Sequence, residues 1–126
     1  MRGEKQKMLH KMKLQDSPFR KMQKGLKTIE LRLYDEKRQK VKVGDQIEFT
    51  NLEDRMQKLL TRVIALHRFD SFEEMFRVLP ASAMGYDKGQ IPNAEDMEHY
   101  YSKEEQALYG VVGIEIELVG TFYETL

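Results

Sequence analysis

The chain has no cysteine among its 126 residues, and its three histidines are spread along its length. Without cysteine there can be no disulfide framework, no thiolate zinc site and no cysteine nucleophile. His10, His67 and His99 form no pair at the i, i+4 spacing that places two metal ligands on one helix face. We therefore predict neither a metal site nor a cofactor.

The sequence also lacks a long apolar run. No stretch approaches the roughly 18 consecutive apolar residues that a membrane span requires. The charged start of the chain, residues 1–5, is not followed by the apolar region of a signal peptide. We expect a cytoplasmic protein with no membrane segment.

What is present is the composition of one small domain. A chain of 126 residues with 40% hydrophobic content can supply a single core without a second one. Residues 1–7 are polar and lysine-rich without periodicity, which predicts a flexible N-terminal arm. Residues 8–126 are then expected to form a single domain.

Charge is unevenly distributed along the chain, although the formal net charge is zero. Residues 1–42 hold 14 lysines and arginines against five acidic residues, a net charge of +9, so the remainder carries −9. This asymmetry predicts a basic face for phosphates and acidic surface elsewhere. The alternative is a solvated surface on which folding mixes the two signs.

Alternation of apolar and polar residues predicts strands, while capping residues, prolines and glycines mark helix ends and turns. In the first half of the chain we expect a strand over 8–14, a short helix that Asp16 caps and Gly25 ends, a strand over 27–34, a polar loop over 35–40, and a strand over 46–50 after a turn at Gly44. In the second half we expect a strand over 59–69, a helix over 71–79, a surface loop over 81–92, helices starting near 93 and 102, and a strand over 112–119. Five or six strands with short flanking helices predict an α+β fold, built as a small mixed β-barrel.

The most informative segment is residues 25–32, with the sequence GLKTIELR. A strand here turns its apolar side chains to the core and its polar side chains, including Glu30 and Arg32, to the opposite side. The segment fits the pattern G-x-K-x-x-E-x-R, with Gly25 and Lys27 at its first two fixed positions. This pattern resembles the signature of the ASCH family, whose fold is similar to that of RNA-binding PUA domains.

The resemblance covers most of the chain from about residue 8 to residue 116. Beyond the signature it rests on residues 17–19, 43–49 and 109–114. It implies a PUA-like β-barrel with a cleft that Lys27, Glu30 and Arg32 line. Family members are thought to bind RNA or modified nucleosides, and some relatives hydrolyse an acetylated cytidine or cut RNA.

The chemistry of the polar residues can be argued separately. Glu30 and Arg32 are two apart on one strand face, so their side chains start roughly 6.6 Å apart and can reach a common ligand or each other. The planar fork of Arg32 suits a phosphate or a base edge. Glu30 can accept a hydrogen bond from an exocyclic amine or a ribose hydroxyl. Lys27 is out of phase with both and joins them only if the strand begins with a bulge or twist.

Each of these residues also has a purely structural interpretation. Glu30 and Arg32 can form an ordinary salt bridge on an exposed sheet face, which is worth little to stability. Gly25 can serve as the C-cap of the preceding helix.

Tyrosines are a second class of candidate. Tyr34 shares the strand face of Glu30 and Arg32, and an aromatic ring there can stack on an unpaired base. Tyr86, Tyr100 and Tyr101 lie on or after the long loop and are further candidates. The alternative for each of them is a place in the core, which is the usual fate of aromatic residues.

The leading functional hypothesis is binding of RNA or a modified nucleoside through a basic cleft. Its predicted ligand-binding residues are Gly25, Lys27, Glu30, Arg32 and Tyr34. A protein partner, held by the acidic later part of the chain, is an alternative.

An amidohydrolase acting on an acylated cytidine is a second hypothesis, with Lys27 activating a nucleophile or water and Glu30 as the base. The small deacetylating relatives carry threonine where this chain has Glu30, so their proposed nucleophile is missing. Their catalytic glutamate falls in a region that corresponds to residues 86–96, where Asp87, Glu95 and Asp96 are candidates. A ribonuclease using the same cleft is a third hypothesis.

Overall fold

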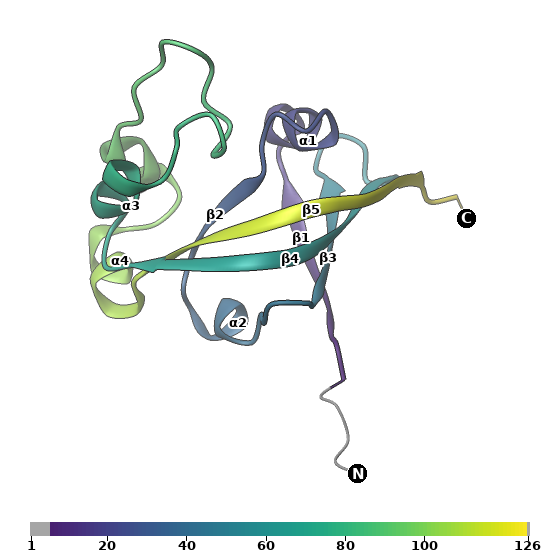
Figure 1. Cartoon of the computed structure of the whole chain (residues 1–126), viewed down its shortest axis with the longest axis horizontal. Helices are drawn as coiled ribbons and strands as arrows, with labels where there is room; N and C mark the ends of the chain where they lie inside the picture. The colour runs from purple at the N-terminus through teal and green to yellow at the C-terminus, as the bar shows by residue number, and fades with distance from the viewer. Residues whose placement is uncertain (1–5, 126) are drawn as a thin grey trace.

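The computed structural model describes residues 6–125. Their elements follow the order β1 (Leu9–Leu14), α1 (Asp16–Gln23), β2 (Ile29–Leu33), α2 (Glu36–Gln39), β3 (Gln46–Asn51), β4 (Gln57–Phe69), α3 (Phe72–Val78), the 3₁₀ helix η1 (Ala94–His99), α4 (Lys103–Tyr109) and β5 (Val111–Tyr123) (Figure 1). The predicted N-terminal arm falls mainly on residues 1–5, outside the described residues. Lys7 Nζ donates to Val43 O at 3.3 Å.

The strands form one mixed sheet in the order β1-β3-β4-β5-β2. β1 runs parallel to β3, and the other neighbours are antiparallel. The α+β class is as predicted, but the closed barrel is wrong. Across the described residues no backbone ladder joins the edge strands β1 and β2. They are linked instead by a side chain, because Arg32 Nη2 donates to Lys13 O at 2.7 Å.

The core consists of two clusters of buried residues on the two faces of the sheet. The first contains apolar residues from β1, α1, β3, β4 and β5, with Phe19 and Phe49 almost fully buried. The second packs α3 and the loop after it against β2, and it includes Ile29, Phe72 and Met84. Burying one such side chain is worth about 1.5–3 kcal/mol. The apolar side chains of β2 therefore pack in the second cluster, and its polar side chains lie on the opposite face of the strand.

Helix α1 ends in a way that fixes the start of β2. Gly25 has φ 77°, and the amides of Gly25 and Leu26 donate to Met22 O at 3.1 Å and Lys21 O at 2.8 Å. These two bonds make a Schellman motif, which needs a residue in the left-handed region. The predicted cap at the helix start is wrong, since Gln15 is the N-cap and makes no side-chain cap bond. Asp16 instead accepts a hydrogen bond from Asn51 Nδ2 at 2.8 Å.

The segment 35–40, predicted as a loop, forms the short helix α2. Asp35 caps it by accepting a hydrogen bond from the Arg38 amide at 3.1 Å. The capping residues predicted later in the chain do begin helices, at Ser71 and Ser102. None of the helices within residues 6–125 is long and apolar enough to cross a membrane.

Asp45 fastens β1 to the turn before β3. Its carboxylate accepts hydrogen bonds from the Met8 and Lys42 amides at 3.1 and 3.0 Å, and it lies 2.8 Å from His10 Nε2. Burial raises the pKa of Asp45, but these hydrogen bonds outweigh it and hold the pKa below its ordinary value. Because Asp45 is only 2% exposed, the group cannot exchange these partners for water.

Replacing this carboxylate should destabilise the fold. We expect Asp45→Ala to lower the free energy of unfolding by about 3 kcal/mol, because two amides lose a charged acceptor. Urea unfolding at pH 7 measures the change. Asp70→Ala removes an exposed carboxylate and should cost less than about 0.5 kcal/mol. Equal losses in the two variants would contradict the role given to Asp45.

Candidate functional site

A cleft of about 520 Å³ opens between the end of β1, the start of α1, strand β2, the loop after α3, and the segment from η1 to residue 101. Three charged side chains that line it come from residues 27–32. Its walls are mostly apolar or aromatic and comprise Pro18, Leu52, Met84, Tyr86, Met97, Tyr100 and Tyr101. The cleft thus combines a group of charged side chains with walls suited to a planar ligand.

Glu30 is the centre of the charged group. Its Oε2 lies 2.6 Å from Arg32 Nε and its Oε1 lies 3.3 Å from Lys27 Nζ. The Glu30 residue is only 6% exposed. The structure therefore brings together the three residues that the sequence predicted for one cleft, and their pairing is far more buried than an ordinary surface salt bridge.

Lys27 reaches Glu30 because it lies just before the strand. The amides of Thr28 and Ile29 both donate to Ala83 O, at 2.8 and 2.9 Å, so regular alternation starts only at Ile29. Lys27 Nζ also donates to Ile29 O at 2.9 Å and to Met84 O at 3.0 Å. Together with the Glu30 carboxylate, these carbonyls place three acceptors around the ammonium.

Arg32 links the charged group to the neighbouring edge strand. Its Nε faces Glu30 while its Nη2 donates to Lys13 O on β1. Burial lowers the pKa of the Arg32 guanidinium, but the nearby Glu30 and Tyr101 outweigh that effect and raise it above its ordinary value. Arg32 is therefore a permanent cation that holds two strands and one carboxylate.

The ionisation of Glu30 follows from the same contacts. Burial raises the pKa of Glu30, yet the charges of Arg32 and Lys27 and their hydrogen bonds lower it more. The net result is a pKa below the ordinary value. Glu30 is thus a stable carboxylate that accepts hydrogen bonds, and it is poorly suited to take up a proton near neutral pH.

Two predicted ligand-binding residues lie outside the cleft lining. Gly25 shapes the end of α1 and does not line the cleft. The Tyr34 ring packs against the first core cluster, with the guanidinium carbon of Arg68 4.1 Å from its centroid. Tyr34 follows the last residue of β2, so its ring is not carried beside Arg32.

The three carboxylates proposed from residues 86–96 separate in the structure. Asp96 lines the cleft. Asp87 is exposed and pairs with Lys21 at 3.1 Å, and Glu95 lines a different surface hollow beside α3. Only Asp96 therefore shares the cleft with Lys27.

Gly85 is a positioning residue that the sequence analysis missed. It has φ +97°, and a Cβ there would lie 3.2 Å from Lys27 Cδ. Lys21 Nζ donates to Gly85 O at 2.6 Å, which ties the loop to α1. A glycine in a loop gives no hint of such a contact, because the partner lies almost 60 residues away in the chain.

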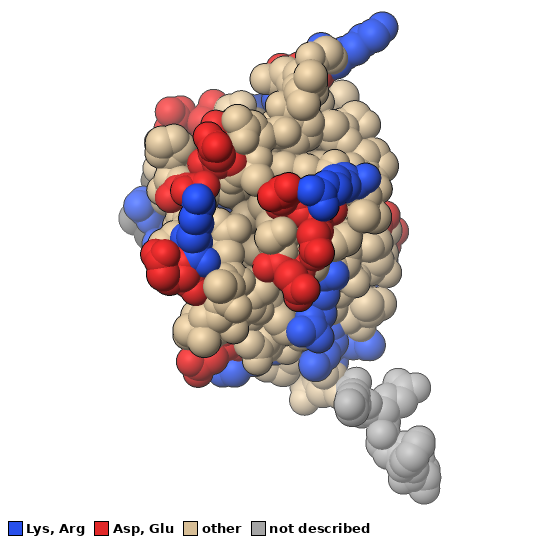
Figure 2. All heavy atoms as spheres, turned by 90° about the vertical axis from the view of Figure 1, so that its left-hand side faces the viewer, with Lys and Arg blue, Asp and Glu red and all other residues tan. Residues whose placement is uncertain are grey.

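The face that carries α3 and α4 has mixed charge. Figure 2 shows acidic and basic side chains interspersed there, with uncharged surface between them. This face agrees with the alternative in which folding mixes the two signs. Within residues 6–125, moreover, no three side chains of His, Asp or Glu gather closely enough to hold a metal ion.

An open mixed sheet with short helices and a charged cleft defines a small α+β domain, and comparisons give its family. The ASCH domain matches residues 12–120, so the chain belongs to the ASCH domain family. No curated protein matches it at a significant level.

Two solved structures are similar to the chain. The crystal structure of the hypothetical protein PH0355 has a TM-score of 0.74 and 33% identity, and the match covers 89% of this chain and all of that one. The solution structure of PF0455 from Pyrococcus furiosus has a TM-score of 0.70 and 34% identity, with 89% and 98% covered. Neither description states an activity.

The buried ionic group predicts a distinctive acid response. We expect Glu30→Gln to lower the free energy of unfolding at pH 7 by about 3 kcal/mol, because two buried cations lose their anion. The native pKa of Glu30 is depressed, so its stabilisation is present above an unfolded-state pKa of about 4.3 and is lost as pH falls through the native value. The difference between wild type and variant should therefore shrink in acid.

Urea unfolding at pH 7 and pH 3.5 tests this expectation. Glu117→Gln is the matched control, because Glu117 pairs with Arg62 at an exposed position and should cost less than about 1 kcal/mol. A difference for Glu30→Gln that stays constant with pH would contradict the ionic role.

Proposed function

We propose that the cleft binds the base of an unpaired nucleoside, either modified and free or within RNA. The observation that carries the proposal is the ionised Glu30, which is held between Lys27 and Arg32 in a cleft with aromatic and apolar walls. The family resemblance, which implies RNA or nucleoside ligands, agrees with this reading of the chemistry.

The charged group supplies directional hydrogen bonding. A carboxylate offers about four acceptor positions, and the contacts with Lys27 and Arg32 leave capacity for a ligand donor. An exocyclic amine of a base is such a donor. Because Glu30 is held rigidly by two cations, it needs no rearrangement to accept this hydrogen bond.

The walls of the cleft suit the faces of a base. Tyr86, Tyr100 and Tyr101 line it together with Met84 and Met97. The Tyr101 ring stacks on Phe72 with centroids 6.1 Å apart, which fixes its orientation. A cleft of about 520 Å³ is within the range of sites for small organic ligands. A nucleoside matches both the shape and the chemistry.

The same contacts disfavour Lys27 and Glu30 as acid–base residues. Lys27 already donates to two backbone carbonyls and pairs with Glu30, and the pKa of Glu30 is lowered. Binding therefore accounts for the geometry better than proton transfer by this pair does. The amidohydrolase alternative depends on Asp96, which lines the cleft and has no ion-pair partner among residues 6–125.

Removing an aromatic wall should weaken nucleoside binding. Tyr100 is 64% exposed, so Tyr100→Ala should leave the fold intact. We expect its dissociation constant for a nucleoside to rise about 5-fold to 150-fold, because stacking on a base is worth about 1–3 kcal/mol. Calorimetric titration with cytidine, N4-acetylcytidine and a panel of modified nucleosides measures it.

Tyr123→Ala is the control for this experiment, because Tyr123 is also exposed but does not line the cleft. It should bind like wild type. Failure of every nucleoside to bind wild type, or equal weakening in the two variants, would overturn the proposal.

Turnover of N4-acetylcytidine separates binding from hydrolysis. Under our proposal the wild-type protein binds the nucleoside but forms no cytidine, as followed by mass spectrometry. Asp96→Asn removes a charge without changing the size of the side chain. Cytidine formed by wild type and not by Asp96→Asn would replace the binding function with the amidohydrolase.

A further inference from the structure

We propose that the base enters the cleft as part of a single polynucleotide strand, whose flanking phosphates lie in a basic groove beside the cleft. This inference rests on the proposed function and names its ligand more closely. RNA and DNA share the phosphodiester chemistry that the groove would recognise, and the test below distinguishes them.

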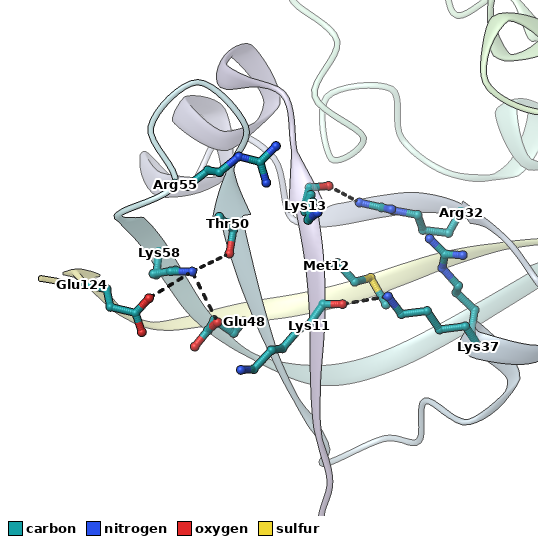
Figure 3. A pocket seen from close by; sticks show the side chains of 11 residues that line it. Lys11, Met12, Lys13, Arg32, Lys37, Glu48, Thr50, Arg55, Lys58 and Glu124 are labelled. Carbon is teal, nitrogen blue, oxygen red and sulfur yellow. Dashed lines mark hydrogen bonds and ion pairs between the residues drawn. The ribbon is translucent and has the colours of Figure 1, made fainter. Parts of the chain in front are cut away.

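The groove has a volume of about 550 Å³ and runs across β1, β3 and α2 (Figure 3). Seven basic residues line it against two acidic ones. Lys11, Lys13, Lys37 and Arg55 are exposed, and no carboxylate pairs with them within residues 6–125. A groove lined by unpaired cations is the usual path for a phosphate backbone.

The two acidic side chains of the groove share one lysine. Lys58 Nζ lies 3.9 Å from Glu48 and 3.5 Å from Glu124. Figure 3 shows this cluster on one side of β1, with Lys37 and Arg32 on the other side. Five positive charges remain when the two acids are set against the seven basic residues, and Lys37, Arg32 and Arg38 belong to this excess.

The edge of β1 shows that the groove suits an anion better than a protein strand. Exposed edge strands can pair with another chain through free backbone groups. Here Lys37 Nζ donates to Lys11 O at 2.9 Å and Arg32 Nη2 donates to Lys13 O at 2.7 Å. Both carbonyls are therefore occupied. At these two positions the edge presents the charged groups of Lys37 and Arg32 to the groove instead of a free backbone acceptor.

The positive field acts on the groove's own lysine. The pKa of Lys37 is lowered, first by burial and then by repulsion from Arg38 and Arg32. In addition, Arg38 Nε is buried without a hydrogen-bond partner among the described residues. A phosphate in the groove would relieve the repulsion between these cations.

Lys13 and Arg32 line both the groove and the cleft, so the two hollows meet at these residues. A nucleotide whose base is held near Glu30 would have its flanking phosphates close to this junction. The strand can then continue along the row formed by Lys13 and Lys11, whose side chains start roughly 6.6 Å apart. A free nucleoside would leave the groove unused.

The test compares strand and nucleoside binding over a series of salt concentrations. The ligands are a fluorescent 12-nucleotide mixed-sequence RNA, the DNA of the same sequence, the RNA duplex, and the tightest-binding nucleoside of the panel. We expect the single strands to bind more tightly than the nucleoside and the duplex. RNA binding tighter than DNA binding assigns the ligand to RNA, and equal binding assigns it to either strand.

The groove variant is the double substitution Lys11→Ala with Arg55→Ala. Two lost phosphate contacts should reduce the slope of log K against log salt by about 1.4 for single strands. Nucleoside binding should not change. The control is Lys24→Ala with Lys103→Ala, which removes two exposed lysines outside the groove and should keep the wild-type slope.

The outcomes separate this inference from the proposed function. Equal slopes in the two double variants, or a strand that binds no tighter than the nucleoside, would overturn the groove while the cleft function stands. If Tyr100→Ala weakened neither ligand, the cleft function would fail instead, and strand binding could not be centred on the cleft.

Discussion

Burying the negative charge of Glu30 is the constraint on which the site depends. A carboxylate taken out of water is costly unless cations and hydrogen bonds replace the solvent. Lys27 and Arg32 provide them. Lys27 is anchored in turn to the backbone carbonyl of Met84, and Arg32 to that of Lys13. One buried charge thus joins β2, the loop after α3 and the edge strand β1.

The same constraint sets what the site can do. Groups that act as acids and bases need pKa values near the working pH and freedom to exchange protons. The Glu30 group has neither, since its charge is fixed by two cations. A fixed array of charge is instead what recognition requires, because its orientation is set before the ligand arrives.

Local pattern allowed much of this arrangement to be predicted, and the misses have physical causes. The alternation of β2 gave the strand, and the turn at Gly25 gave the helix end, because both depend on neighbouring residues. The closed barrel was wrong because local pattern does not show whether two edge strands, far apart in the sequence, pair with each other. In the structure the Arg32 side chain joins β2 to β1 at the Lys13 carbonyl in place of a backbone ladder. The helix at 36–39 was missed because its only signal is the single cap at Asp35.

The partners of the charged group were equally hidden from the sequence. Met84 and Gly85 meet Lys27 only after the loop folds back over it, and Asp96 enters the cleft from a separate segment. The family pattern pointed to Lys27, Glu30 and Arg32, while Tyr34 shared their alternation but lies beyond the end of β2. Periodicity therefore predicted the side of the strand more reliably than its last residue.

The attachment of the loop to α1 has a consequence for selectivity. Lys21 holds the loop through Gly85 O and Asp87, while Lys27 holds it through Met84 O. A wall anchored at several points cannot easily move outward to admit a larger group or inward to follow a smaller one. Discrimination between related ligands would then come from steric exclusion and from hydrogen bonds left unmade. Bulky additions to a bound base would be rejected more strongly than small ones.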